Sequence, residues 1–378
     1  MHPIPQQNHV VSALPVDGTG FQIGWDHAHH GLVPPGPWMR ASSAVHQGWS
    51  AAKAVFGLRT LRACSATRSW LALRLLARQR GWVFEDQQVT PNYLKQIQVQ
   101  RCPVRRQSLG GAPGQADAAV HARINPDGGV AAGNLVQLSA AAALLLEQVD
   151  VEEAVRRARH AECTGAEVEG QDAATWWRLA ALRAFATPLP FALVARLPLA
   201  LLPPNRVRLL NAVQGLQALV TQMFAAPGWS ARCQALARLL PDHTLRHDFN
   251  LFVGAMAPRV LEAGPGRADL RRALEDAWLG ERVQRRWQHL VLSLGEAGTE
   301  SLLAQVVGSA LAQCGGVRVL SHAPEQATEG WSLRAGSDQT ALGRSRAGVR
   351  LLRQLKPFAP LAVRPGTNRP PSAPATHA

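Results

Sequence analysis

The pattern of apolar and polar positions predicts helix over most of the second half of the chain. Apolar residues also recur at helical spacing over residues 66–80, and Gly81 then ends the segment. Asp172 suits the N-cap of a further helix, and proline and glycine breaks separate those that follow. The expected helices in this part cover residues 150–160, 173–179, 206–225, 230–240, 243–263, 267–279, 282–294 and 299–314. Short connections between them predict an all-α domain.

The N-terminal part has a less regular pattern. Residues 20–25 are typical of a short strand after a glycine turn, and the prolines of residues 34–38 exclude regular structure there. Thr90 and Pro91 predict the N-cap and first position of a short helix that runs to Ile97.

A knuckle, a β-hairpin and a helix are predicted between Cys102 and Leu146. Val120, Ala122 and Ile124 alternate as in a strand, and a glycine-rich turn follows. We therefore expect a mainly α (α+β) protein with a small ββα finger module embedded between an irregular, then helical N-terminal region and an all-α domain. The expected boundaries are 1–88 for the N-terminal region, 89–148 for the module, 149–325 for the helical domain, and 326–378 for a basic, Gly/Ser/Pro-rich and largely disordered tail.

Composition narrows the class of protein. With 47% hydrophobic and 17% charged residues in 378, wholesale disorder is excluded and two or three domains are expected. The five cysteines are widely spaced without a C-x-x-C pair, which argues against a disulfide framework or zinc finger and favours a reducing cytoplasm. Residues 1–15 lack a signal-peptide pattern, and the longest apolar stretch, 188–202, is too short to span a bilayer. We expect a cytoplasmic protein without membrane association.

The formal net charge is +14, and it is unevenly placed. Residues 1–110 hold 12 basic and 4 acidic residues, a net +8, whereas residues 111–172 hold 4 and 10, a net −6. A basic surface attracts polyanions, so the N-terminal part is a candidate nucleic-acid surface. A solvated basic surface without a specific partner explains the same charges.

One stretch carries a family resemblance. Cys102-Pro103-Val104-Arg105 is followed by Val120-His121-Ala122-Arg123-Ile124, two turn glycines and Gly133-Asn134-Leu135. Over roughly residues 90–146 the chain resembles the HNH, or His-Me finger (treble-clef), endonuclease module. Its intron- and phage-type members read C-P-V/I-T, then D-R-I/V, then G-Y-x-x-G-N-L/V, and end in a helix bearing Asn and Lys. The resemblance implies phosphodiester hydrolysis with one divalent metal, Mg²⁺, Mn²⁺ or Zn²⁺, if the site is active.

The departures from this pattern fall on the positions that carry chemistry. Ala122 stands where the Asp is expected, and Ala143 lies near the position of the helix Asn. Arg105 replaces the Thr of the knuckle, Val130 replaces the Tyr, and Leu146 lies near the expected Lys. The surviving residues are mostly framework residues. We therefore expect a module that kept its shape and lost most of its catalytic groups.

His121 precedes the missing Asp by one position. Because neighbouring strand residues point to opposite faces, His121 replaces the Asp only if the strand is bulged or the register is shifted by one. In that active reading His121 and Asn134 are the catalytic and metal-binding residues. In the inactive reading Arg105, Arg106 and Arg123 hold a phosphate backbone.

A second pair of candidate metal ligands is His27 and His29, which would share a face on a strand. Zinc usually takes three or four protein ligands, and no further ligand is near in the sequence, so a solvated loop explains the pair as well. His243 and His247 are spaced for one helix face but lack the Glu of a metalloprotease helix.

Three functions remain open. The first is a nucleic-acid-associated protein related to HNH endonucleases, impaired or inactive in cleavage, with DNA as its partner. The second is a structural or interaction protein whose helical domain binds a protein partner. The third is an active metal-dependent DNA endonuclease. The chain has no Walker loop, dinucleotide fingerprint or G-x-S-x-G elbow, so the NTPase, Rossmann and α/β-hydrolase classes lose support.

Overall fold

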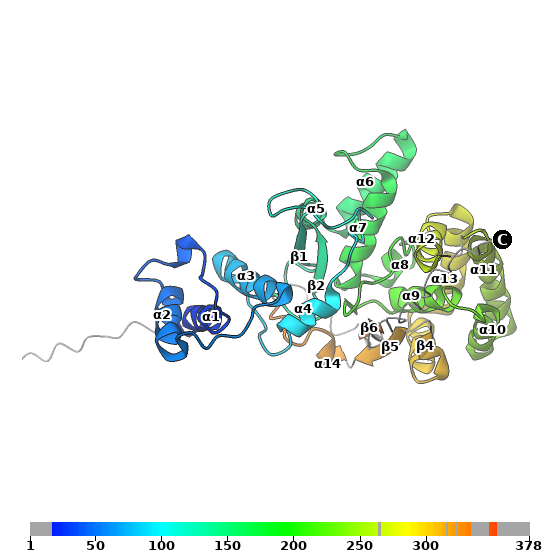
Figure 1. The fold of residues 1–378 in the computed structure, drawn as a ribbon. Helices are drawn as coiled ribbons and strands as arrows, with labels where there is room; N and C mark the ends of the chain where they lie inside the picture. The colour runs from blue at the N-terminus through cyan, green and yellow to red at the C-terminus, as the bar shows by residue number, and fades with distance from the viewer. Residues whose placement is uncertain (1–16, 264–265, 315–316, 323, 334–347, 354–378) are drawn as a thin grey trace, which may run out of the picture.

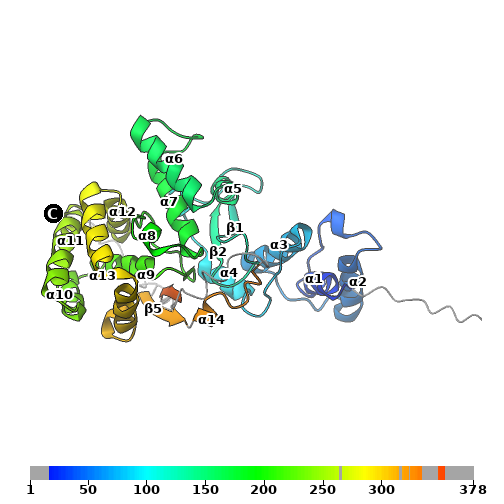
Figure 2. The same cartoon turned by 180° about the vertical axis from the view of Figure 1, so that it is seen from behind.

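The computed structural model describes residues 17–263, 266–314, 317–322, 324–333 and 348–353. It is mainly helical with two small antiparallel sheets, which confirms the predicted mainly α (α+β) class. Figure 1 shows an elongated molecule: a helical arm at one end, the small hairpin sheet in the middle and a helical bundle at the other end. The same order is visible from behind in Figure 2.

The N-terminal arm is a pair of helices, α1 (Gly18–His29) and α2 (Ala44–Phe56), joined through the short η1 (Gly36–Trp38). The prediction of a strand over residues 20–25 is therefore wrong. The glycines there allow close helix packing rather than a turn. A Cβ on Gly24 would lie 1.9 Å from the Val45 carbonyl oxygen, and a Cβ on Gly48 would lie 1.8 Å from that of Phe21.

Helix α3 (Ser65–Arg80) connects the arm to the middle of the molecule. It ends at Gly81, in the left-handed conformation, as the sequence predicts. Its basic side chains pair with α1, where Arg78 Nη1 donates to Asp17 at 2.9 Å and Arg74 pairs with Asp26. The next helix, α4 (Pro91–Ile97), begins with the expected cap, in which the Thr90 hydroxyl accepts a hydrogen bond from the Tyr93 amide.

The predicted hairpin and trailing helix are present. Strand β1 (Ala119–Arg123) pairs antiparallel with β2 (Leu135–Ser139), and Ser139 caps α5 (Ala140–Gln148). Within β2, Val136 and Leu138 join one apolar core with α5, while Leu135 joins a second core with α4. Because both faces of β2 are covered, all five of its residues are buried.

The helical domain follows, and its core is rich in aromatic residues such as Trp176, Trp278 and Trp287. Its helices are α6 (Val151–Thr164), α7 (Ala173–Phe185), α8 (Phe191–Val194), α9 (Ala212–Phe224), α10 (Trp229–Leu239), α11 (His243–Glu262), α12 (Arg267–Ala277) and α13 (Glu281–Val307), with a final short η2 (Ala310–Ala312). Helix α13 is bent at Gly295, where the predicted break lies, because that glycine has φ 73 and ψ 173. By length and composition alone α13 could cross a membrane, and 33% of its most apolar window is buried inside the structure.

A second sheet corrects the expectation that the helical domain is all-α. Its strands β3 (Arg208–Leu209), β6 (Gly348–Arg353), β5 (Val317–His322) and β4 (Gln313–Cys314) lie in that order, and α14 (Pro324–Ala327) follows β5. The region 149–325 is therefore not all-α, and the described parts of the predicted tail, residues 326–333 and 348–353, contain the end of α14 and strand β6. Pairing between distant segments has no local pattern in the sequence. The rest of the predicted tail lies outside the described residues.

Candidate groove between a strand and a helix

A cavity of about 220 Å³ lies between β1 and α5 and extends to the end of α3. Its polar lining comes from four segments that are separate in sequence, so the fold has to assemble it. We call this cavity the β1–α5 groove and define it by its chemistry-bearing residues, Arg80, Trp82, His121, Arg123, Glu147 and Arg183.

The two positions where the resemblance calls for metal ligands meet at this groove. Ala122 from β1 and Ala143 from α5 both line it, and both are half-buried against the main core. They present methyl groups where the HNH pattern has Asp and Asn. Among the described residues there is no group of three or more His, Cys, Asp or Glu side chains placed to hold a metal ion.

His121 also lines the groove. Burial lowers the pKa of its imidazole to about 4, so the ring is neutral near pH 7, and its buried Nε2 has no hydrogen-bond partner among the described residues. The β1–β2 ladder pairs every residue from Ala119 to Arg123 one to one, with His121 opposite Gln137. There is thus no bulge in β1, so His121 takes the place of the missing Asp only if the register of the motif is shifted by one.

Asn134 lies outside the groove. Its side chain is fully buried and makes three hydrogen bonds inside the loop between the two strands. Oδ1 accepts from the Asn125 amide at 2.7 Å, and Nδ2 donates to the carbonyls of Asn125 and Gly129, each at 3.0 Å. The structure does not bring Asn134 and His121 together as a metal pair, since the Asn134 amide is used in shaping the loop.

The arginines of the groove fall into two kinds. Arg183 is buried and donates to the carbonyls of Val149, Ile124 and Leu146, and burial lowers its pKa to about 10. By contrast, Arg80 is exposed and lies 5.8 Å from the centre of the Trp82 ring. The Arg123 guanidinium lies 3.8 Å from the same ring and donates to the carbonyls of Pro126 and Gly128.

Trp82 therefore carries two guanidiniums at one side of the groove. The sequence analysis missed Arg80 and Trp82 as site residues, although both flank the helix-ending Gly81. In the sequence they are marked only as a basic and an aromatic residue at the end of a helix. That combination is common at protein surfaces, so it does not indicate a site.

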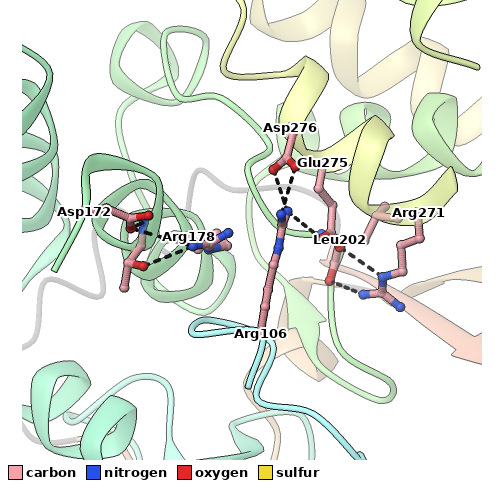
Figure 3. A network of polar contacts seen from close by, with 8 residues as sticks. Arg106, Asp172, Arg178, Leu202, Arg271, Glu275 and Asp276 are labelled. Carbon is pink, nitrogen blue, oxygen red and sulfur yellow. Dashed lines mark hydrogen bonds and ion pairs between the residues drawn. The ribbon is translucent and has the colours of Figure 1, made fainter. Parts of the chain in front are cut away.

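The remaining predicted phosphate contacts lie elsewhere. Arg106, in a left-handed conformation with φ 59, reaches α12 and pairs with Glu275 at 3.3 Å and Asp276 at 2.7 Å. Figure 3 shows this ion pair beside the contact between Arg178 and Asp172. Arg106 thus joins the knuckle to the helical domain, and the half-buried Arg105 does not line the groove.

The strand face that His27 and His29 were expected to share as a metal pair is not present. His27 and His29 lie on helix α1, where residues two apart point to different faces. The His27 side chain is buried and bonds through Nδ1 to the Ile23 carbonyl at 2.8 Å, and burial lowers its pKa. The His29 ring stacks on Phe56 with centroids 4.6 Å apart.

Comparison of the chain with protein-family models, curated proteins and solved structures finds no match. Kinship with HNH endonucleases therefore stays a prediction, carried by the short motif and by the strand–strand–helix order around it.

Proposed function

We propose that this chain is a nucleic-acid-binding protein related to HNH endonucleases, and that it holds the phosphate backbone at the β1–α5 groove without cleaving it. The observation that carries the proposal is the lining of the groove. Ala122 and Ala143 supply no metal ligand, while Arg80 and Arg123 gather on Trp82 beside them.

The side chains that line the groove suit the binding of nucleic acid. Guanidiniums are the usual partners of phosphate oxygens, and an aromatic ring offers a base a surface for stacking. The neutral His121 adds a ring nitrogen in the same groove, and the part of the chain that the structure describes offers this nitrogen no hydrogen-bond partner. Glu147 is the one acidic residue in the lining, and it is exposed, so water screens its charge.

The chemistry for cleavage is missing from the same place. Hydrolysis by a single-metal site needs side chains that hold the ion and a base that activates water. The two methyl groups at positions 122 and 143 can do neither. A neutral His121 does not replace them, because one nitrogen ligand does not hold a hard divalent cation.

Salt-dependent binding tests the proposal. Fluorescence anisotropy with labelled duplex and single-stranded DNA, between about 50 and 200 mM salt, should show affinity that falls as salt rises. Arg80→Gln should weaken binding to every sequence and reduce the salt slope by about 1. Trp82→Ala should weaken single-stranded binding more than duplex binding, because unstacked bases are the ones that use the ring.

Arg282→Gln is the matched control, since it removes an exposed arginine on α13 away from the groove. Affinity that is independent of salt, or equal in Arg80→Gln and the wild type, would contradict the proposal. Plasmid nicking with Mg²⁺ or Mn²⁺ that disappears in His121→Ala would instead support the active nuclease.

The alternative, a helical domain that binds a protein partner, stays a prediction. Large exposed apolar side chains are what such a surface needs. In the described part of the helical domain these are Leu261 and Leu292, whereas Val55, Leu58 and Leu61 lie close together in sequence at the end of the arm. This distribution does not favour the helical domain as the binding surface.

A further inference from the structure

A second cavity, of about 270 Å³, lies where the knuckle of the hairpin module meets α12. Arg101 and Arg106 line it from the knuckle, and Arg271, Arg272 and Glu275 line it from the helix. Part of this junction is visible in Figure 3, where Arg106 and Arg271 approach Glu275 from different elements. It shares none of its lining with the β1–α5 groove.

The charge of this cavity is strongly positive. Four guanidiniums line it against the Glu275 carboxylate, and Asp276 beside it also pairs with Arg106, which leaves a net charge of +2. Glu275 is buried and already neutralised, because Arg106 Nη2 lies 3.3 Å from Oε2 and Arg271 Nε lies 3.0 Å from Oε1. Two arginines then remain, Arg101 and Arg272, for which the described part of the chain provides no ion pair.

These two guanidiniums come from opposite sides of the junction. Arg101 stands just before the knuckle and Arg272 is in the second turn of α12, so a ligand bound by both would bridge the module and the helical domain. Positive charge in a concave, partly apolar site attracts anions more strongly than the same charge on an open surface. Phosphate, with several acceptor oxygens, matches two such donors.

The other walls favour a ligand with a flat organic part. Pro103, Leu201 and Pro204 provide apolar surface, while Gln96 and Gln98 provide amide groups. Amides can donate to and accept from the edges of a nucleobase. The volume is near the lower end of ligand pockets, which span roughly 300–1,000 Å³, so one nucleotide unit fits the size better than a longer chain.

We propose that this knuckle–α12 cavity binds one phosphate-bearing nucleotide, with the phosphate on Arg101 and Arg272 and the base against Pro103 and Pro204. The nucleotide can be free or can be the 5′-phosphorylated end of a strand, since both present the same chemistry. The inference goes beyond the proposed function, because it concerns a separate cavity and does not require the β1–α5 groove to bind anything.

Isothermal titration of the full chain with AMP, inorganic phosphate and a 5′-phosphorylated oligonucleotide tests the site. We expect saturable binding of AMP, at least about tenfold tighter than inorganic phosphate because the apolar walls and amides add to the contact. The double variant Arg101→Gln/Arg272→Gln should weaken it by about tenfold or more. Arg282→Gln should bind AMP like the wild type, and Trp82→Ala should too, which separates this site from the groove.

If AMP does not bind but the 5′-phosphorylated oligonucleotide does, and the double variant loses the advantage of the 5′-phosphate over a 5′-hydroxyl strand, the occupant is a strand end. Equal binding by the double variant and the wild type would overturn the proposal, as would the absence of binding by all three probes. Circular dichroism should show unchanged melting of the double variant, because neither side chain is buried and neither has an ion pair within the described residues.

Discussion

At the scale of single residues, burial decides which predicted site residues keep their chemistry. Asn134 was a candidate metal ligand, yet its amide is fully buried and saturated by backbone partners. The buried Nε2 of His121 has no hydrogen-bond partner among the described residues, and the pKa of the ring is strongly lowered. The same loop and strand therefore contain one polar group that stabilises the fold and one that destabilises it.

The lowered pKa of His121 predicts acid sensitivity. In the folded protein the ring takes up a proton only near pH 4, whereas in the unfolded chain it does so near the ordinary histidine pKa of 6.5. The unfolded state thus binds more protons between these values, and stability falls as pH drops through them. The loss through this residue should be about 2 kcal/mol between pH 7 and pH 4.5.

Urea unfolding of the wild type and of His121→Gln at both pH values measures this loss of stability. The variant should lose less stability on acidification than the wild type. His160→Gln, which changes an exposed histidine on α6, serves as the control and should follow the wild type. An equal loss in all three proteins would show that His121 is solvated.

At the scale of elements, local sequence signals predicted helix ends correctly where each signal had one structural meaning. Caps and terminating glycines placed α3 and α4, because a cap satisfies orphan backbone groups within a few residues of the chain. Gly20 and Gly24 led to the wrong prediction of a strand after a turn, because glycine suits both a turn and a close contact between helices. Only the position of the partner helix α2 shows which of the two is present. The helix predicted over 206–225 begins only at Ala212, since Arg208 and Leu209 form a strand with the distant β6.

The close contact between α1 and α2 predicts that a glycine-to-alanine substitution there lowers the stability of the protein, although alanine favours the helix. Gly24→Ala should gain up to about 1 kcal/mol in helix propensity. The new Cβ would nevertheless meet the Val45 backbone oxygen at 1.9 Å, so the helices must separate. We expect a net loss of about 2 kcal/mol from overpacking. Hydrogen exchange of the α1 amides should be faster in the variant.

Gly254→Ala is the matched control, because Gly254 is an exposed position inside α11 with open space around its Cβ. The same substitution there should stabilise the protein by roughly 0.5–1 kcal/mol. If Gly24→Ala were also stabilising, the arm helices would not be packed through these glycines.

At the scale of the whole molecule, distant segments hold the hairpin loop in place. Trp331 is fully buried against the loop, donates from Nε1 to the Ala132 carbonyl at 3.0 Å, and accepts from the Gly129 amide at 2.6 Å. Arg208 bonds through its amide to the Gly133 carbonyl and through its guanidinium to the carbonyls of Gln326, Ala327 and Glu329. The C-terminal residues thus support the module that comes 200 residues earlier in the chain.

Trp331→Ala should therefore destabilise the module and not only the C-terminal segment. The lost ring leaves a cavity, and we expect a decrease of about 3–5 kcal/mol in the free energy of unfolding. Hydrogen exchange at Gly129 and Val130 should become faster, because Trp331 packs over their loop.

Trp331→Phe provides the comparison, since it keeps one aromatic ring in place and loses the bond to Ala132 together with the rest of the indole. Its cost should be smaller, with about 1 kcal/mol from the hydrogen bond. If Trp331→Ala unfolded at the same urea concentration as the wild type, the C-terminal segment would not be part of the folded unit.

The sequence alone determined the helical class, the caps of several helices, and the hairpin with its trailing helix around residues 119–148. These features depend on backbone groups and apolar positions a few residues apart, which a local pattern can encode. Only the tertiary structure decided that Ala122 and Ala143 meet at one groove, that Asn134 is used inside a loop, and that Arg106 pairs with α12. Those outcomes depend on burial and on partners many residues away, and neither is written in the local order of side chains.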